Sequence, residues 1–124
     1  MKKSIHAFAF LLLCFFVAGC SNESAVSFSQ DIHPILKENC YPCHQVGGAG
    51  ELASGLSVEN YESLMQGTKI GPVIQPGQSY ASTLQVLVEH KAGEEINMPK
   101  GGIKLAQEKI EIIGKWIDQG AKNN

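Results

Sequence analysis

Apolar residues form one continuous run near the amino terminus and four later stripes in which they recur every three or four positions. The run covers Ile5 to Phe16 and is interrupted only by one histidine. The stripes predict amphipathic helices over about 28–39, 57–66, 79–90 and 106–119, because this spacing places the apolar side chains on one helix face. No segment shows the strict alternation that is typical of a strand.

Residues at the ends of two stripes support these helix limits. Ser29 or Asp31 is the expected amino-terminal cap of the first helix, and Pro34 then falls in the first turn, where its missing N–H costs little. Gly67 and Gly120 follow the second and fourth stripes and are expected to end those helices.

Long loops separate the predicted helices. A Gly-rich segment covers 40–50, two Pro-Gly or Gly-Pro pairs lie between 67 and 78, and Met98-Pro99 lies within 91–104. Loops of this length in a small domain need a component around which to pack. The sequence predicts an all-α domain of four to five short helices with long loops.

Residues 1–19 have the plan of a secretory signal peptide, with two lysines, an apolar run and then small residues. The run is too short to cross a bilayer comfortably as a helix. Val17-Ala18-Gly19-Cys20 resembles the bacterial lipobox, in which cleavage leaves a lipid-modified cysteine as the first residue. The alternative is an ordinary signal peptide followed by an unmodified Cys20.

The 124 residues provide room for one folded domain. The predicted division is a signal peptide over 1–19, a lipidated Cys20 with a polar tether over 20–27, and the folded domain over 28–124. A tether of this length reaches at most roughly 25 Å, and it would keep the domain close to its membrane.

Charge and composition exclude two classes of protein. The chain has 10 lysines, no arginine and 12 acidic residues, a formal net charge of −2 that becomes more negative when the signal peptide leaves. Nucleic-acid-binding proteins usually carry a basic excess, so no nucleic-acid partner is expected. A chain that is 44% hydrophobic and 18% charged is not typical of a disordered protein.

Cys40-Tyr41-Pro42-Cys43-His44 is the attachment sequence of c-type haem. Two thiols at this spacing add to the two vinyl groups of one porphyrin, and the histidine that follows is then held beneath the iron as its proximal ligand. Export agrees with this interpretation, because c-type haem is attached outside the cytoplasm.

Two other chemistries could use the same motif. A redox dithiol of the thioredoxin kind requires alternating strands and helices, which this chain does not show. A zinc site would use Cys40 and Cys43 with two histidines, and His33 or His90 could complete it, although neither stands at a typical spacing.

An electron carrier needs a sixth iron ligand, and four residues are candidates. Met98 is favoured because a loop methionine before Pro99 can be held rigidly and lies outside every apolar stripe. Met65 lies in a helical stripe, where core packing is the more common role. His33 is expected to be solvated near a helix cap, and His90, at the end of a helix, is the reserve ligand.

Short motifs spread between residues 28 and 121 match one family of haem proteins. They are Asp31-Ile32, Pro34-Ile35-Leu36, Cys40-x-x-Cys43-His44, Gly55-Leu56, Pro76-Gly77, Ser82, Met98-Pro99 and Trp116-Ile117-Asp118-Gln119-Gly120-Ala121. With these motifs the chain resembles the planctomycete-type cytochrome c domain. The resemblance implies a cytochrome c-like fold around one covalently bound haem c.

The same resemblance implies roles for individual residues. Cys40 and Cys43 would form the haem thioethers, with His44 as the proximal and Met98 as the distal iron ligand. It also implies that the terminal helices pack together near the haem edge. The residues expected at that contact are Phe28, Ile32, Leu36, Ile113 and Trp116.

Cytochromes of this class commonly use a proline carbonyl to accept the N–H of the proximal histidine, and Pro72 and Pro76 are both candidates. The chain departs from the family at two positions. Gln45 stands where glycine is common, and Ala106 stands where the last helix usually begins with Ser or Thr. The alanine forgoes a cap worth about 1 kcal/mol.

The resulting hypothesis is a lipid-anchored single-haem electron carrier that is not an enzyme by itself, although it could serve a separate enzyme. The chain contains no dinucleotide fingerprint and no nucleophile constellation. The alternative is a five-coordinate haem sensor or peroxidase-like protein, in which Met98 does not bind the iron.

Partners and location follow from charge and anchor. The acidic mature surface favours redox proteins with basic patches. Acyl chains on Cys20 predict attachment outside the cytoplasm. Because Ser21 follows the cysteine, this means the periplasmic side of the outer membrane in a cell with two membranes. In a cell with one membrane it means the outer face of the plasma membrane.

Overall fold

The computed structural model describes residues 23–124, and within this part of the chain it contains helices and no strand. The all-α prediction is confirmed, with six short α-helices where four to five were expected. The signal peptide and Cys20 lie outside the described residues. The helices are α1 (His33–Asn39), α2 (Tyr41–His44), α3 (Ala49–Ser54), α4 (Tyr61–Gln66), α5 (Thr83–Val88) and α6 (Gln107–Asp118), with single turns η1 (Phe28–Ile32) and η2 (Ser79–Ala81).

The first predicted helix is present as η1 running directly into α1. Its cap is Ser27, whose hydroxyl accepts the backbone N–H of Gln30 at 3.2 Å. The expected cap Asp31 instead accepts the N–H of Ser27 at 2.8 Å, so both the N–H and the hydroxyl of Ser27 are paired at the start of the helix. Pro34 lies in the first turn of α1, as predicted.

Replacing Ser27 with alanine should lower the free energy of unfolding by about 1 kcal/mol, because an amino-terminal N–H loses its acceptor. Urea denaturation followed by circular dichroism measures this loss. Ser29→Ala is the matched control, since that exposed hydroxyl bonds only Ser27 and the backbone carbonyl of Asn124. Equal losses in the two variants would show that Ser27 has no special role as a cap.

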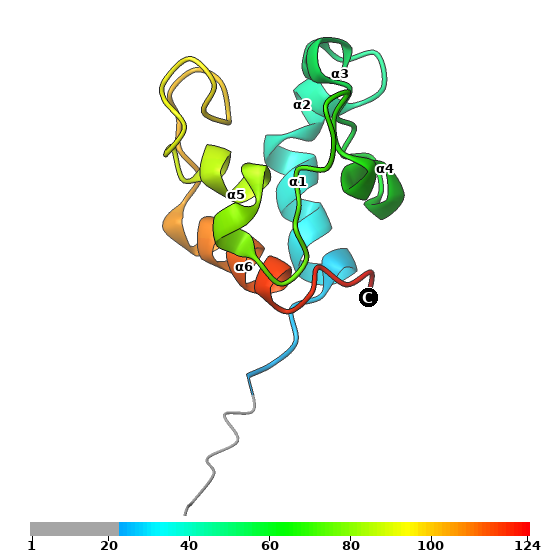
Figure 1. Ribbon diagram of the computed structural model, residues 1–124, viewed down its shortest axis with the longest axis vertical. Helices are drawn as coiled ribbons and strands as arrows, with labels where there is room; N and C mark the ends of the chain where they lie inside the picture. The colour runs from blue at the N-terminus through cyan, green and yellow to red at the C-terminus, as the bar shows by residue number, and fades with distance from the viewer. Residues whose placement is uncertain (1–22) are drawn as a thin grey trace, which may run out of the picture.

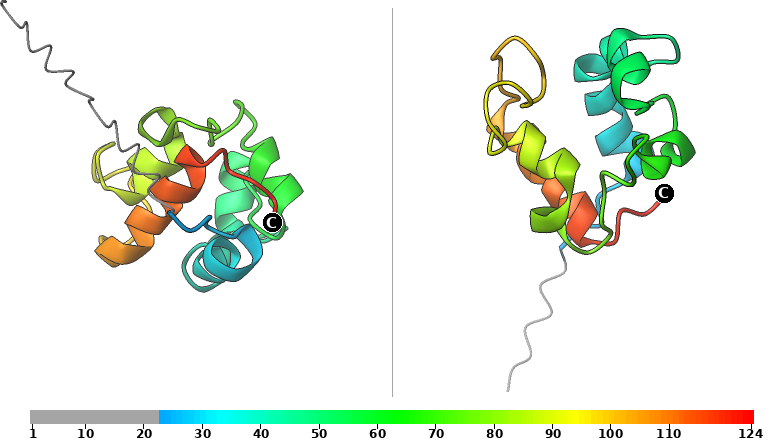
Figure 2. Two further views of the ribbon diagram at one scale, coloured as in Figure 1. Left: turned by 90° about the horizontal axis from the view of Figure 1, so that it is seen from below. Right: turned by 45° about the horizontal axis from the view of Figure 1, so that its top comes forward.

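The helices form two groups that meet at one end of the molecule (Figure 1). In the first group α1 packs against η1 and α2, and α2 packs against α3. In the second, α5 packs against α6 and η2, and α6 reaches η1 of the first group. At the opposite end, α2 and α3 stand across from the loop that connects α5 to α6, as the right view of Figure 2 also shows.

The predicted contact between the terminal helices lies at the end where the two groups join. The ring centroids of Phe28 and Trp116 are 5.6 Å apart, and Tyr61 packs edge-on against both rings. All five residues expected at this contact are at most 5% exposed, which confirms their burial. They are Phe28, Ile32, Leu36, Ile113 and Trp116.

Two of the predicted segments differ from the structure. The Gly-rich segment 40–50 contains α2 and the start of α3 instead of a plain loop. The second helix begins at Tyr61, because Asn60 accepts the N–H of Ser63 at 2.8 Å and forms a capping box with it. Gly67, with a φ of 80°, ends this helix as predicted.

The segment 23–27, called the amino-terminal strap below, lies against the folded domain. Val26 is 7% exposed and belongs to the core. Its N–H donates to the side chain of Gln119 at 2.7 Å, and its carbonyl accepts from the side chain of Asn124 at 3.3 Å. The tether predicted up to residue 27 is therefore too long, because residues distant in sequence hold its second half in place.

None of the helices in residues 23–124 is both long enough and apolar enough to cross a membrane.

Candidate haem site

The Cys-x-x-Cys-His motif folds into a single turn at the junction of α1 and α2. Cys40 lies between the two helices as the carboxy-terminal cap of α1 and the amino-terminal cap of α2, and its N–H donates to the carbonyl of Leu36 at 2.9 Å. The N–H groups of Cys43 and His44 both donate to the carbonyl of Cys40. One helical turn therefore carries both thiols and the imidazole, with Cys43 exposed and Cys40 half-buried.

Burial, together with the smaller effect of the neighbouring Cys43, raises the pKa of the Cys40 thiol to about 11. At neutral pH this thiol is protonated. Catalytic dithiols instead depend on a thiol whose pKa is lowered, because the thiolate is the nucleophile. The environment of Cys40 thus disagrees with a thioredoxin-like redox centre.

The imidazole of His44 is buried and held by a backbone carbonyl. Its Nδ1 donates to the carbonyl oxygen of Leu56 at 3.1 Å, and Val58 donates its N–H to the carbonyl of His44 at 2.9 Å. The expected acceptor, the carbonyl of Pro72 or Pro76, is therefore wrong, because the chain returns to His44 much earlier. A proton fixed on Nδ1 leaves the lone pair of Nε2 available to a metal.

Two glycines next to the motif are essential to its packing and were not singled out from the sequence. A Cβ atom at Gly50 would lie 2.8 Å from Cε1 and 2.9 Å from Nε2 of His44. A Cβ atom at Gly48 would lie 2.5 Å from the carbonyl oxygen of Cys43. Only glycine at position 50 therefore keeps the metal-facing nitrogen of His44 uncrowded.

Met98 lies in the loop between α5 and α6, where its backbone is held on both sides. Its N–H donates to the carbonyl of Leu87 at 3.1 Å, and its carbonyl accepts from Nε2 of His90 at 3.2 Å. Asn97, 7% exposed, accepts the N–H of Ala92 at 3.0 Å and closes the loop. His90, expected as the reserve ligand, instead positions the segment that carries Met98.

His90→Asn should loosen this loop. Asparagine tolerates the left-handed conformation of position 90, whose φ is 59°, but its side chain is too short to keep the bond to Met98. We expect a loss of about 1 kcal/mol in unfolding free energy and faster proteolysis within residues 91–104. Unchanged proteolysis would mean that the imidazole does not hold the loop.

The remaining ligand candidates take structural roles. His33 is half-buried, not freely solvated as expected, because its ring stacks on Phe28 at 5.5 Å and its Nε2 donates to the carbonyl of Glu59 at 3.0 Å. Met65 packs against the core, as predicted. In residues 23–124 no three His, Cys, Asp or Glu side chains lie close enough together to hold a metal ion, so the zinc arrangement is not formed there.

The chemistry of the site fits a covalently bound haem. Two free thiols and a histidine with an available Nε2 lie on α2 and its amino-terminal cap. Met98 belongs to the loop between α5 and α6, which stands across from α2 (Figure 1). Both sides also expose large aliphatic side chains, which are costly to leave in water. Val46 and Leu52 are 71% and 64% exposed beside the motif, and Ile96 and Ile103 are 53% and 78% exposed in the opposite loop.

Comparison with known families agrees with this chemistry. The family model described as Planctomycete cytochrome C matches residues 40–109, a segment that includes Cys40, Cys43, His44 and Met98. No curated protein and no solved structure matches the chain significantly. The match covers more than half of the chain, which therefore belongs to the planctomycete cytochrome C family.

Proposed function

We propose that this chain is a membrane-anchored monohaem c-type cytochrome that transfers single electrons between redox partners on the extracytoplasmic side. Membership of a cytochrome c family supports a haem-binding electron carrier. The observation that carries the proposal is the hydrogen bond from Nδ1 of His44 to the carbonyl of Leu56. Because this bond keeps the proton on Nδ1, the lone pair of Nε2 is available to a metal on the same helical turn as the two thiols.

Four residues would hold the haem. Cys40 and Cys43 would form the thioether bonds, His44 would be the proximal ligand and Met98 the distal one. The bound group supplies a reversible one-electron couple at its iron. The Leu56 carbonyl keeps the proton on Nδ1 and fixes the plane of the imidazole. A methionine sulfur favours the reduced iron and raises the potential relative to a second histidine.

A carrier function follows from this ligand set. With His44 and Met98 as ligands the iron would have no position left for a substrate, so the chain would pass electrons without catalysing a reaction itself. Lysine residues of a partner could pair with acidic groups on the surface of this protein. Exposed carboxylates include Glu38, Glu94, Glu95, Glu108 and Glu111. Soluble or membrane redox proteins with basic patches are accordingly the proposed partners.

The proposed anchor is a lipid on Cys20, which would place the domain on the extracytoplasmic surface of a membrane. Ser21 after that cysteine suggests the outer membrane if the cell has two. Replacing Cys20 with serine should release the protein from the membrane fraction and abolish its labelling by a radioactive fatty acid. Continued sedimentation of the variant with membranes would refute the anchor.

The haem proposal is tested by expressing the whole chain together with a cytochrome c maturation system. A pyridine haemochrome assay and haem staining after denaturing electrophoresis should show one covalent haem per chain. The Cys40→Ser/Cys43→Ser double variant should carry none, whereas Ala53→Ser at an exposed position of α3 should match the native protein. Bound zinc without haem, or no cofactor at all, would overturn the proposal.

A further inference from the structure

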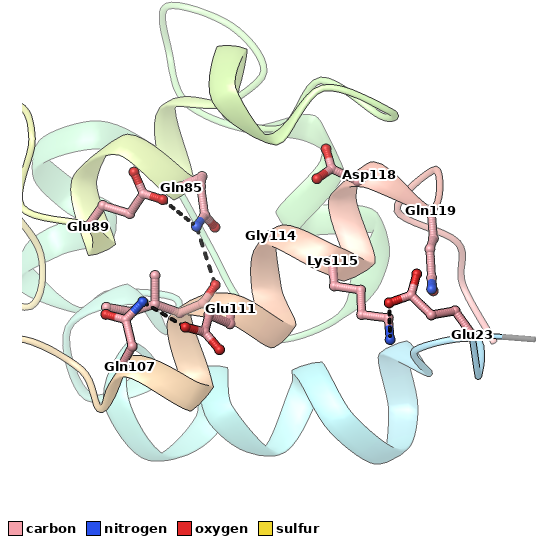
Figure 3. A pocket seen from close by; sticks show the side chains of 10 residues that line it. Glu23, Gln85, Glu89, Gln107, Glu111, Gly114, Lys115, Asp118 and Gln119 are labelled. Carbon is pink, nitrogen blue, oxygen red and sulfur yellow. Dashed lines mark hydrogen bonds and ion pairs between the residues drawn. The ribbon is translucent and has the colours of Figure 1, made fainter. Parts of the chain in front are cut away.

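The amino-terminal strap is fixed to one end of α6. Glu23 pairs with the ammonium of Lys115 at 3.1 Å. The side-chain nitrogen of Gln119 donates to the carbonyl of Ser24 at 3.3 Å, and its side-chain oxygen accepts the N–H of Val26 at 2.7 Å. Figure 3 shows Glu23, Lys115 and Gln119 together at this end of the helix. The folded domain thus holds the chain from its first described residue.

The last residues of the described chain close over the strap. Besides its bond to Val26, Asn124 accepts the N–H of Phe28 at 2.9 Å through its side chain and the N–H of Ser29 at 3.0 Å through its carbonyl. Val26 is almost completely buried between these partners. With a buried side chain and bonds on both sides, the strap has no freedom to swing as a flexible tether would.

Little chain remains between the strap and the proposed lipid. Cys20 and Glu23 are separated by three peptide links, which span at most roughly 11 Å when fully extended. Only the end of the domain at which the strap begins can therefore lie next to the lipid surface. An anchor on a docked strap sets the orientation of the domain as well as its location.

The two ends of the molecule carry different features. The strap, η2 and the end of α6 lie at one end, and α2, α3 and the loop 91–104 lie at the other (Figures 1 and 2). On η2, Tyr80 is 80% exposed, while its neighbour Ser79 binds the carboxylate of Asp118 on α6 with both its N–H and its hydroxyl. Tyrosine is a residue typical of the membrane–water interface, because its ring is apolar and its hydroxyl is polar.

We propose that the lipid-anchored protein contacts its membrane through the strap, η2 and the end of α6, and that its haem motif faces the aqueous compartment. The partner that exchanges electrons at the haem is then a water-soluble protein and not one embedded in the same bilayer. This inference rests on the proposed lipid at Cys20 and the proposed haem at His44.

The test uses the full lipidated and haem-loaded protein in vesicles of phosphatidylcholine with a nickel-chelating lipid. One cysteine is introduced as Tyr80→Cys or as Ala53→Cys and carries a nitroxide spin label. Both positions are exposed, and the elements that carry them, η2 and α3, lie at opposite ends of the domain. Cys40 and Cys43 are blocked by the haem, and a comparison of vesicles with and without nickel separates the relaxation caused by the headgroups from that caused by the haem iron.

The relaxation enhancement caused by nickel should be several-fold greater at position 80 than at position 53. A flexible Gly-Ser insertion of about ten residues between Asn22 and Glu23 is the control, because it lengthens the reach without touching the strap, and it should make the two positions similar. Similar enhancement without the insertion, or greater enhancement at position 53, would overturn the orientation. Failure to float with vesicles, or absence of haem, would instead refute the proposed function on which the orientation depends.

Discussion

Replacing Met98 with alanine is expected to lower the midpoint potential of the haem and to open one side of the iron to added ligands. Loss of the sulfur removes the ligand that favours reduced iron, and axial ligands span roughly 0.8 V in proteins, so a shift on the order of 0.1 V is expected. Redox titration measures the shift, and carbon monoxide binding to the reduced protein reports the open position. The weak far-red band of an iron–methionine bond should disappear.

Met65→Leu is the matched control for this experiment, since Met65 packs against the core and should leave the potential unchanged. If Met98→Ala keeps both the potential and the far-red band, Met98 is not the ligand. Rapid carbon monoxide binding by the native protein at neutral pH would favour the five-coordinate sensor or peroxidase-like alternative.

Gly50→Ala should destabilise the protein by about 1–3 kcal/mol and reduce the fraction of chains that carry haem. Alanine is the better helix former by about 1 kcal/mol, so propensity alone predicts the opposite sign. The added Cβ would lie 2.8 Å from Cε1 of His44, however, and overpacking of this kind outweighs the gain. Urea denaturation and the haem content per chain provide the two measurements.

Ala53→Leu adds more bulk to an exposed position of the same helix and should change neither quantity appreciably. A Gly50→Ala protein that is more stable than the native one and fully loaded with haem would show that the imidazole is free to move aside. The requirement for glycine at this position would then be abandoned.

The long terminal helices could be predicted from the sequence, because a sustained apolar stripe determines both their existence and their buried face. The one-turn helix α2 and the short α3 could not. Isolated helices of this length are unstable in water. Their formation depends on the packing of α2 against α1 and of α3 against α2, and on the hydrogen bonds around His44. This packing is not visible in the sequence, so the glycines at 47, 48 and 50 led to the prediction of a loop.

The parts of the site that are made of side chains could be predicted from the sequence. The thiol spacing and the adjacent histidine identify the attachment motif without a structure. The partner of His44 is a backbone carbonyl, which every residue possesses, so nothing about the leucine at position 56 marks it as the acceptor. The role of Gly50 likewise appears only once α3 is placed beside the imidazole.

The small, polar residues of the strap predict a free tether. The contacts of Val26 that hold it are made with Gln119 and Asn124, which are more than ninety positions away in the chain. Contacts between distant segments are not visible in local patterns of sequence.

The two groups of helices meet chiefly where η1 packs on α6, and this has a consequence for how the molecule unfolds. Amide protons around the Trp116 and Phe28 rings are expected to exchange only through global unfolding. Those of α2, α3 and the 91–104 loop should exchange through local opening whenever haem is missing. Hydrogen exchange would then distinguish a chain awaiting its cofactor from a mature one by the protection of that half alone. Covalent attachment of the proposed haem would then complete the packing of the second half of the molecule in addition to supplying a redox centre.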